Sequence, residues 1–251
     1  MSKLPIITVV TVTFNAGVGL AKTIESVLGQ TYKSIQYIVV DGGSTDNSNE
    51  ILDRYRSYFY KCVSEKDDGV YDAMNKGLSL ATGKWIIFLN AGDRFADRDT
   101  LATVFSNRNY NEVDIIYGDY LFQDQKGEVR CGLSGQHKNL KYGSQFCHQS
   151  TFINTKYHSR YPYDKNIKIT ADHKFFLEAQ RNHANFRKID VVVSICECGG
   201  ISDRYRLKTV LEWWRNTGWD WSCCFQYSGK ILKEISVQCA RMGVRFIKGR
   251  I

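Results

Sequence analysis

Acidic and amide side chains recur in this sequence directly after runs of apolar residues. Asn15 and Asp41 each follow such a run, an acidic turn at 65–68 follows a third, and Asn90 and Asp93 follow a fourth. Carboxylates brought together repel one another unless a cation or hydrogen-bond donors hold them, and hard cations prefer such oxygen ligands. Mg²⁺ is commonly bound through one or two carboxylates plus substrate phosphates, so the pattern suits a nucleotide diphosphate.

The apolar runs predict buried strands that bring these groups together. Residues 85–89 are five consecutive apolar residues, too few to span a membrane, and predict a strand buried on both faces. Residues 6–12 and 35–40 predict similar strands, and 58–64 a less regular one. In an open parallel sheet, ligands bind outside the carboxyl ends of the strands. We therefore expect the polar residues to converge there.

Amphipathic helices are expected between these strands. Apolar residues recur at helical spacing in residues 17–30 and 70–81, and a helix is also expected at about 46–55. This alternation is the βαβ pattern of a parallel, doubly wound sheet. There is no GxGxxG after the first strand and no GxxxxGK[ST], which argues against a Rossmann dinucleotide site and a P-loop.

The pattern loosens after Asp93. The further elements that we expect are a helix at 99–107, a strand at 114–118, a hairpin around 125–127, a short apolar segment at 150–153, a helix from 172 to about 181 and a strand at 186–196. Three polar residues lie at their ends. Asp119 follows a strand, His148 precedes the short apolar segment, and Asp172 opens a helix.

Composition is ordinary for a soluble globular protein, with 43% hydrophobic and 24% charged residues among 251. The sequence lacks the pattern of a secretory signal and any apolar run long enough for a transmembrane helix. The eight cysteines are scattered and lack the paired CxxC spacing of a zinc site. We therefore expect reduced thiols in a cytoplasmic protein.

The net charge of +8 is concentrated at the C-terminus. Residues 1–203 hold 24 Lys/Arg and 23 Asp/Glu, whereas residues 204–251 hold 10 and 3. One apolar face there comprises Leu207, Val210, Leu211 and Trp214, and a second comprises Ile231, Ile235, Met242 and Phe246. Such basic helices with clustered Trp residues suit an anionic membrane surface. The alternative is that they pack on the core and that their charge is only solvated.

Several short motifs resemble glycosyltransferases of family 2. They are TFN (13–15), DGGSTD (41–46), G-x-x-x-A-x-N-x-G (69–77) and FLNAGD (88–93), and this match covers roughly the first hundred residues. Further on, YGD (117–119), HQ (148–149), ADHKFFL (171–177) and GGIS (199–202) resemble a bacterial subgroup that builds surface polysaccharides such as colanic acid or the O-antigen of lipopolysaccharide.

The resemblance implies an α/β GT-A fold, with a Rossmann-like, mostly parallel central sheet flanked by helices. Residues 1–203 would form the catalytic domain, with a nucleotide-sugar half (1–98) and an acceptor half (99–203). Residues 204–251 would form a basic helical extension. The implied enzyme transfers a sugar from a nucleotide-diphosphate sugar to a lipid-linked saccharide, with inversion and a divalent metal (Mn²⁺ or Mg²⁺). It would be peripheral at the inner face of the cell membrane.

Site residues follow from the matched motifs. Asp41 would contact the base or ribose of the nucleotide, Asp93 would hold the metal, and Asp172 would be the catalytic base. The further nucleotide-sugar residues would be Asn15, Asp67, Asp68, Asn75 and Asn90, and the candidates for the acceptor site are Asp119 and His148. A base is needed because a hydroxyl is a poor nucleophile until its proton is removed.

Two positions depart from the family pattern, and plainer interpretations remain open. The usual DxD reads Asn90-Ala91-Gly92, which leaves one carboxylate, and the usual ARN reads Ala73-Met74-Asn75. Asp41 and Asp119 could be turn residues, Asp93 an ordinary loop acid, and Asp172 a helix N-cap.

Two other functional classes compete with the enzyme. One is a protein that binds nucleotide sugars or polysaccharide and has lost turnover through the change at Asn90 and Gly92. Nucleic-acid binding by the basic C-terminus is the other, but no RNP, helix-turn-helix or finger signature is present, so we expect no nucleic-acid partner.

Overall fold

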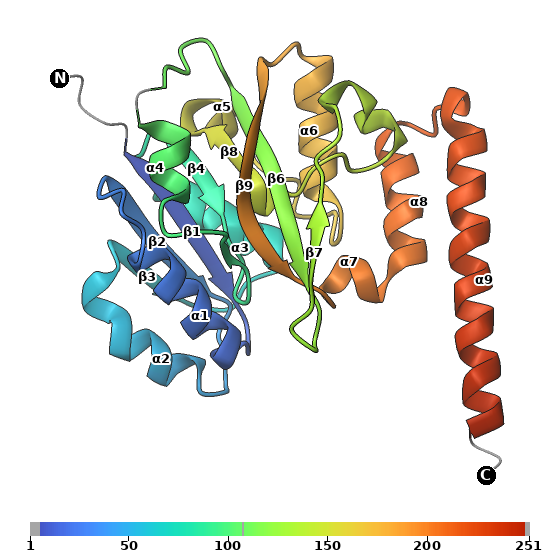
Figure 1. The fold of residues 1–251 in the computed structure, drawn as a ribbon, viewed down its shortest axis with the longest axis horizontal. Coiled ribbons are helices and arrows are strands. Elements are labelled where there is room, and N and C mark those ends of the chain that lie inside the picture. The colour runs from blue at the N-terminus through green and yellow to red at the C-terminus, as the bar shows by residue number, and fades with distance from the viewer. Residues whose placement is uncertain (1–5, 107, 249–251) are drawn as a thin grey trace.

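The computed structural model describes residues 6–106 and 108–248, with side chains up to residue 238. In this part of the chain nine strands build one central sheet (Figure 1). The strands are β1 (Ile7–Thr13), β2 (Ile35–Asp41), β3 (Lys61–Ser64), β4 (Trp85–Phe88), β5 (Arg94–Phe95), β6 (Ile115–Gln123), β7 (Val129–Gly132), β8 (Thr151–Asn154) and β9 (Phe186–Glu197).

The sheet is mixed, whereas the sequence predicted a mostly parallel one. Its order is β3-β2-β1-β4-β8-β6-β9-β5, with β7 paired to β6. The first four strands in this order are parallel, as is the pair β6–β9, but β8 runs antiparallel to both β4 and β6. The chain reaches β8 from the β6–β7 hairpin through two short 3-10 helices, η2 (His137–Tyr142) and η3 (His148–Ser150), and not through the α-helix of a βαβ crossover.

The predicted helices form, with shifted ends. The helices are α1 (Gly17–Leu28), α2 (Ser48–Tyr55), α3 (Val70–Ser79), α4 (Thr100–Phe105), α5 (Thr155–Arg160), α6 (Ala171–Arg181), α7 (Ile201–Arg204), α8 (Arg206–Asn216) and α9 (Cys224–Lys248). The helix expected from Asp172 begins at Ala171, and its N-cap residue is Thr170. Asp172 therefore is not the N-cap of this helix.

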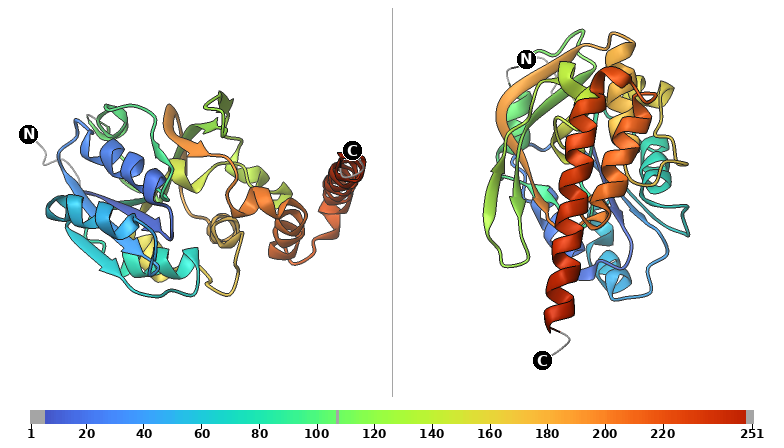
Figure 2. Two further views of the ribbon diagram at one scale, coloured as in Figure 1. Left: turned by 90° about the horizontal axis from the view of Figure 1, so that it is seen from below. Right: turned by 90° about the vertical axis from the view of Figure 1, so that its right-hand side faces the viewer.

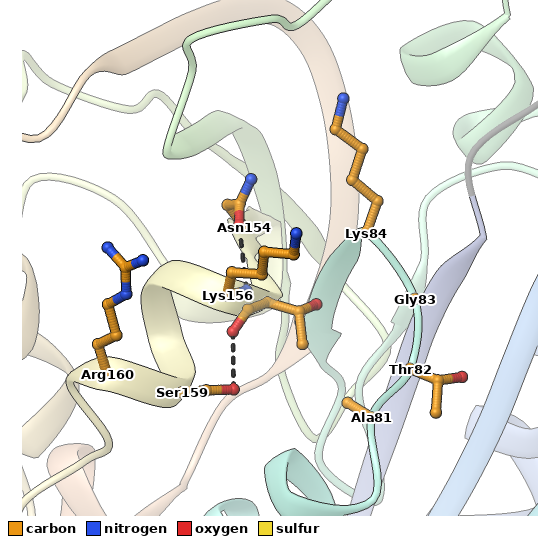
Figure 3. Close-up of a pocket in the computed structure, with 9 residues that line it drawn as sticks. Ala81, Thr82, Gly83, Lys84, Asn154, Lys156, Ser159 and Arg160 are labelled. Carbon is orange, nitrogen blue, oxygen red and sulfur yellow. Dashed lines mark hydrogen bonds between the residues drawn. The ribbon is translucent and has the colours of Figure 1, made fainter.

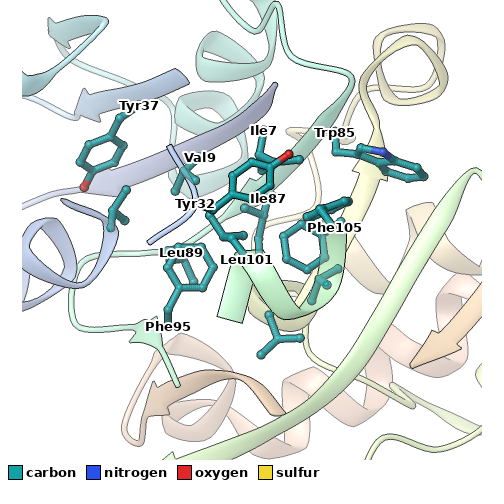
Figure 4. Packing of buried hydrophobic residues seen from close by; sticks show 14 of the residues in the cluster. Ile7, Val9, Tyr32, Tyr37, Trp85, Ile87, Leu89, Phe95, Leu101 and Phe105 are labelled. Atoms are coloured by element: carbon teal, nitrogen blue, oxygen red, sulfur yellow. The ribbon is translucent and has the colours of Figure 1, made fainter. Parts of the chain in front are cut away.

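Two apolar layers cover the two faces of the sheet. Alternate residues of β1 and β4, such as Val9 and Ile87, pack with α1, α2 and α4 on one face (Figure 4). Their neighbours Val10 and Ile86 pack with α3 and α6 on the other. Both faces of β4 are therefore buried, as its continuous apolar run predicts, and the strand is fixed in position before the polar turn that follows it.

The C-terminal helices lie to one side of the sheet, where α8 packs on α6 and α9 on α8 (Figures 1 and 2). Val210 of α8 and Tyr227 of α9 are buried together with Cys223. Part of the first predicted apolar face thus packs on the protein, but Leu211 is 37% exposed. Ile231 of the second face packs on this cluster, Ile235 is exposed, and Met242 and Phe246 lie outside the described side chains.

No helix within the described residues is long and apolar enough to cross a membrane.

Candidate active site

The ends of β1 and β2 are joined by a network of side-chain hydrogen bonds. Asn15 has a positive φ of 50°, a conformation that Asn tolerates better than most residues, and its Oδ1 accepts from Thr45 N at 2.8 Å. Asn15 N donates to Ser44 Oγ at 2.8 Å. Asp41 is fully buried, and its carboxylate accepts from Ser44 and from Ser64 Oγ. Asp41 thus fixes the 42–46 loop from inside.

The acidic turn before α3 lies against the same loop. Asp67 Oδ1 accepts from Gly69 N at 2.8 Å, and Asp67 is so close to Gly42 that a Cβ there would lie 2.4 Å from its Oδ2. Asp68 is exposed, with Lys165 Nζ 3.8 Å from its carboxylate. Asp67 and Asp68 therefore lie at the edge of the sheet where β1 and β2 end.

Asn75 has a structural partner. Its Nδ2 donates to Tyr163 O at 2.8 Å, and its Oδ1 accepts from Tyr163 N at 3.0 Å. The amide thus ties α3 to the segment before α6, and a contact of Asn75 with a nucleotide stays a prediction.

Asp93 joins three segments at the end of β4. It is 5% exposed, its Oδ2 accepts from Gln149 Nε2 at 2.8 Å, and its Oδ1 accepts from Glu197 N at 3.0 Å. Burial raises the pKa of Asp93 to about 6, although these two hydrogen bonds oppose the rise. No Lys or Arg pairs with Asp93 among the described residues. The carboxylate is therefore buried without a cationic side chain of that kind to compensate it.

A carboxylate–imidazole pair lies beside this turn. His148 Nδ1 is 2.9 Å from Asp172 Oδ2, and their side chains are 14% and 22% exposed. Asp172 Oδ1 also accepts from Tyr71 Oη at 2.9 Å and from His173 N at 2.8 Å. Asp172 is thus held by groups from α3, α6 and η3.

Each member of this pair stabilises the charged form of the other. Burial alone would lower the pKa of His148, but the hydrogen bond and charge of Asp172 raise it to about 9. Burial alone would raise the pKa of Asp172, but the hydrogen bond and charge of His148 outweigh it, and the pKa lies below its usual value. The pair is therefore an imidazolium and a carboxylate at neutral pH.

Asn90 connects the pair to the turn after β4. Asn90 Nδ2 lies 3.4 Å from His148 Nε2, while its Oδ1 is buried without a hydrogen-bond partner in the described structure. A protonated His148 would favour the Asn90 oxygen on the imidazole side. Whichever way the amide is turned, one polar atom of Asn90 has no hydrogen-bond partner in the described structure.

The residues fit a divalent cation that is held mainly by a bound substrate. Among the described residues, no group of three or more His, Cys, Asp or Glu could hold a metal. Asp93 supplies the carboxylate of the turn itself, and the Glu197 carboxylate lies against Gly92, where a Cβ would be 2.8 Å from Glu197 Oε2. Each oxygen of Asp93 keeps a lone pair beyond the bond it already accepts. Mg²⁺ is often bound through a single carboxylate plus phosphates, so this donor set is sufficient only with such a ligand.

Asp119 lies apart from these groups. It is on β6, and its Oδ1 accepts from Ser134 N at 2.7 Å with Lys188 Nζ at 3.9 Å. No hydrogen bond or ion pair in the described structure joins it to Asn90, Asp93, His148 or Asp172. An acceptor-site role for Asp119 stays a prediction.

Two residues of this network were not among the predicted site residues. Gln149 adjoins His148 in the HQ motif, which was the available signal for it. Tyr71 had no signal, because its partner Asp172 is 101 positions away.

A cavity in the described structure lies elsewhere (Figure 3). It measures about 740 Å³ and is lined by residues 81–84, which precede β4, and by residues from Asn154 to the end of α5, among them Lys156 and Arg160. None of the predicted site residues lines it. This cavity and the predicted site residues therefore lie in different parts of the structure.

Comparisons with known proteins agree on one family. The profile described as glycosyl transferase family 2 matches residues 8–161. A PGL/p-HBAD biosynthesis glycosyltransferase of Mycobacterium bovis is 31% identical over 206 residues, which are 79% of this chain and 80% of that protein. An uncharacterized glycosyltransferase of Mycobacterium tuberculosis is 33% identical over 186 residues, 71% of this chain and 70% of that one.

Two solved structures share the fold at low identity. Residues 1–349 of S. aureus TarS in complex with UDP give a TM-score of 0.63 at 18% identity, covering 82% of this chain and 65% of that one. The mannosyltransferase PcManGT from Pyrobaculum calidifontis, in complex with GDP-Man and Mn²⁺, gives 0.66 at 16% identity, covering 87% and 66%.

Proposed function

Because this chain belongs to glycosyl transferase family 2, we propose that it transfers a sugar from a nucleotide-diphosphate donor to an acceptor hydroxyl, with Asp172 as base. The family and the relatives show that the chain is a glycosyltransferase. Its fold is a mixed α/β fold that resembles GT-A. The observation that carries the proposal is Asp172 itself. It is an ionised carboxylate held by His148 and Tyr71 next to the turn after β4.

The donor site of this proposal is the edge where β1, β2 and β4 end. Asn15 and the 42–46 loop would bind the nucleoside, with Asp67 and Asp68 beside it. Asp41 would act mainly through the loop that it organises, since its carboxylate is already occupied by Ser44 and Ser64. The free polar atom of Asn90 would bind the donor near its diphosphate.

Asp172 would supply the base. The acceptor oxygen attacks the anomeric carbon, the bond to the diphosphate breaks, and the hydroxyl proton passes to an oxygen of Asp172. A base on the side opposite the leaving group gives inversion at the anomeric carbon. His148 and Tyr71 hold the carboxylate in one orientation, and by keeping it ionised they keep it able to accept the proton.

A divalent cation, Mn²⁺ or Mg²⁺, would be held by Asp93 together with the donor and would neutralise the charge of the departing diphosphate. Two other protein groups at this turn position the Asp93 side chain. Gln149 and the backbone of Glu197 hold the Asp93 carboxylate in place through hydrogen bonds to its two oxygens.

We further propose a saccharide acceptor on a lipid carrier, used in surface-polysaccharide synthesis, and attachment at the inner face of the cell membrane. Exposed apolar side chains at the C-terminal helices support this: Trp221 is 79%, Phe225 89% and Leu232 67% exposed. The net charge of +7 over residues 204–251 would favour an anionic surface.

A panel of nucleotide sugars, assayed with and without Mn²⁺, tests the proposal. We expect one or a few donors to raise the melting temperature and to be consumed in the presence of a lipid-linked saccharide. Donor binding without transfer or hydrolysis under any condition would favour the alternative, a binding protein without turnover. Absence of both would contradict the proposed function.

A further inference from the structure

Two thiols meet behind the turn that holds Asp93. Cys147 precedes η3 and Cys196 lies near the end of β9, and their sulfur atoms are 3.4 Å apart although the residues are 49 positions apart in the chain. Cys196 is 3% exposed, whereas Cys147 is half-buried. Cys196 is therefore enclosed by the protein, whereas Cys147 is the partly exposed residue of the two.

The same two elements are joined a second time next to the thiols. Ser150 Oγ and Ser194 Oγ are 2.6 Å apart, and Ser194 Oγ is also 3.6 Å from Cys196 Sγ. These contacts hold η3 against β9. The approach of the two sulfur atoms is thus fixed by the fold rather than by the rotation of one exposed side chain.

We propose that Cys147 and Cys196 form an oxidation site, which hydrogen peroxide or a similar small peroxide converts into a disulfide. Peroxide transfers one oxygen to Cys147, giving a sulfenic acid and water. The sulfur of Cys196 then displaces a second water and forms the S–S bond. The two thiols together lose two protons and two electrons, and one peroxide takes them up to become two waters. Since a disulfide is about 2.0 Å long, the sulfurs must approach by about 1.4 Å.

The consequence for the site rests on the proposed function. The Cys147 thiol donates to Gln149 Oε1, and Gln149 Nε2 donates to Asp93 Oδ2. Glu197, the neighbour of Cys196, donates its N–H to Asp93 Oδ1. Oxidation removes the thiol donor to Gln149 and draws together the two segments that hold Asp93. The disulfide therefore lowers sugar transfer, and its reduction restores it.

Peptide mapping of the whole protein tests the oxidation site without any assay of activity. After treatment with hydrogen peroxide and digestion without reductant, we expect a linked pair of peptides containing Cys147 and Cys196, which dithiothreitol separates. The exposed Cys131 serves as the control, since Cys131→Ser should leave this linkage and its yield unchanged. Oxidation confined to exposed cysteines, with no such linkage, would overturn the proposal.

Sugar transfer measured on the same samples tests the coupling. We expect peroxide to lower the rate at least tenfold in the wild type and in Cys131→Ser, with recovery in dithiothreitol. In Cys147→Ser and Cys196→Ser, peroxide should lower the rate much less, relative to the rate of the same variant before treatment. A fully formed disulfide that leaves the rate unchanged would overturn the coupling. If the reduced protein transfers no sugar at all, the proposed function fails, while the mapping still decides the oxidation site.

Discussion

His148 Nδ1 lies 2.9 Å from Asp172 Oδ2, and the two side chains come from different elements, η3 and α6. Both are largely buried, and each shifts the pKa of the other toward its charged form. Removing one partner of such a pair leaves an uncompensated buried charge, so the two residues should behave as a unit in mutagenesis. The predictions for this pair therefore need a readout that separates chemistry from stability.

Replacing His148 should change the pH dependence of turnover. In His148→Gln the burial of Asp172 is no longer opposed by the imidazolium, so the pKa of Asp172 rises. The acid limb of the kcat profile, which reports loss of the ionised base, should therefore move up by about 1–3 pH units. Profiles between pH 4.5 and 8 check this: a limb from Asp172 should appear in this range in His148→Gln and be absent from it in the wild type. A uniformly lower rate in His148→Gln, with no new limb, would mean that His148 does not act through Asp172.

Asp93 should control metal-dependent turnover. Asp93→Asn keeps the size of the side chain but removes the charge that would hold a cation together with the donor. We expect turnover to become insensitive to Mn²⁺ and to fall at least tenfold, while the melting temperature changes little. Asp53→Asn, at an exposed acid of α2 that pairs with Arg56, is the matched control. Full activity of the wild type in EDTA would show that no cation is needed.

The exposed aromatic side chains after α8 should bind a membrane surface. Replacing Trp221 and Phe225 with Ser should lower affinity for anionic vesicles at least tenfold, because burying one such ring contributes about 1.5–3 kcal/mol. The matched control replaces Tyr58 and Tyr60 with Ser. Both are exposed aromatic residues near β3. Equal vesicle binding by the two double variants, or none by the wild type, would contradict membrane attachment.

Much of the fold could be predicted because its signals are local. The buried strand β4, the amphipathic helices α1 and α3 and the turn at Asn90 each depend on neighbouring residues in the sequence. The direction of β8 could not be predicted, because a four-residue apolar segment fits a parallel or an antiparallel neighbour equally well.

The site was predictable in its residue types but not in their partners. Asn75 and Asn90 have the same amide, yet Asn75 is satisfied by the backbone of Tyr163, whereas Asn90 keeps a free polar atom. Asp41 likewise follows a strand as expected, but serine hydroxyls occupy its carboxylate. Such differences arise from contacts between distant parts of the chain, which spacing within the sequence does not encode.

Acid should destabilise the protein through His158. This side chain is fully buried among the rings of Phe88, Tyr163 and Phe175, and burial lowers its pKa to about 4. As pH falls from about 6.5 to 4, His158 takes up a proton in the unfolded chain but not in the folded protein. This lowers the free energy of unfolding by about 3 kcal/mol. Denaturant titrations at pH 7 and 4.5 should show a smaller loss in His158→Phe. Equal losses in both proteins would exclude His158 as the cause.

Asp172 as general base gives the most direct prediction. Asp172→Asn keeps the shape of the side chain, and its amide oxygen can still accept from Tyr71, but it cannot take up the proton of the acceptor hydroxyl. Since general-base catalysis typically contributes about 10²–10⁴ in rate, kcat should fall by that factor while donor affinity is retained. A purely structural Asp172 would instead lower the melting temperature and leave turnover of the folded fraction nearly normal. Measuring kcat, donor affinity and melting temperature for Asp172→Asn and Asp172→Ala separates the two roles. Near-wild-type turnover in Asp172→Asn would exclude it as the base and make Asp119 the next residue to test.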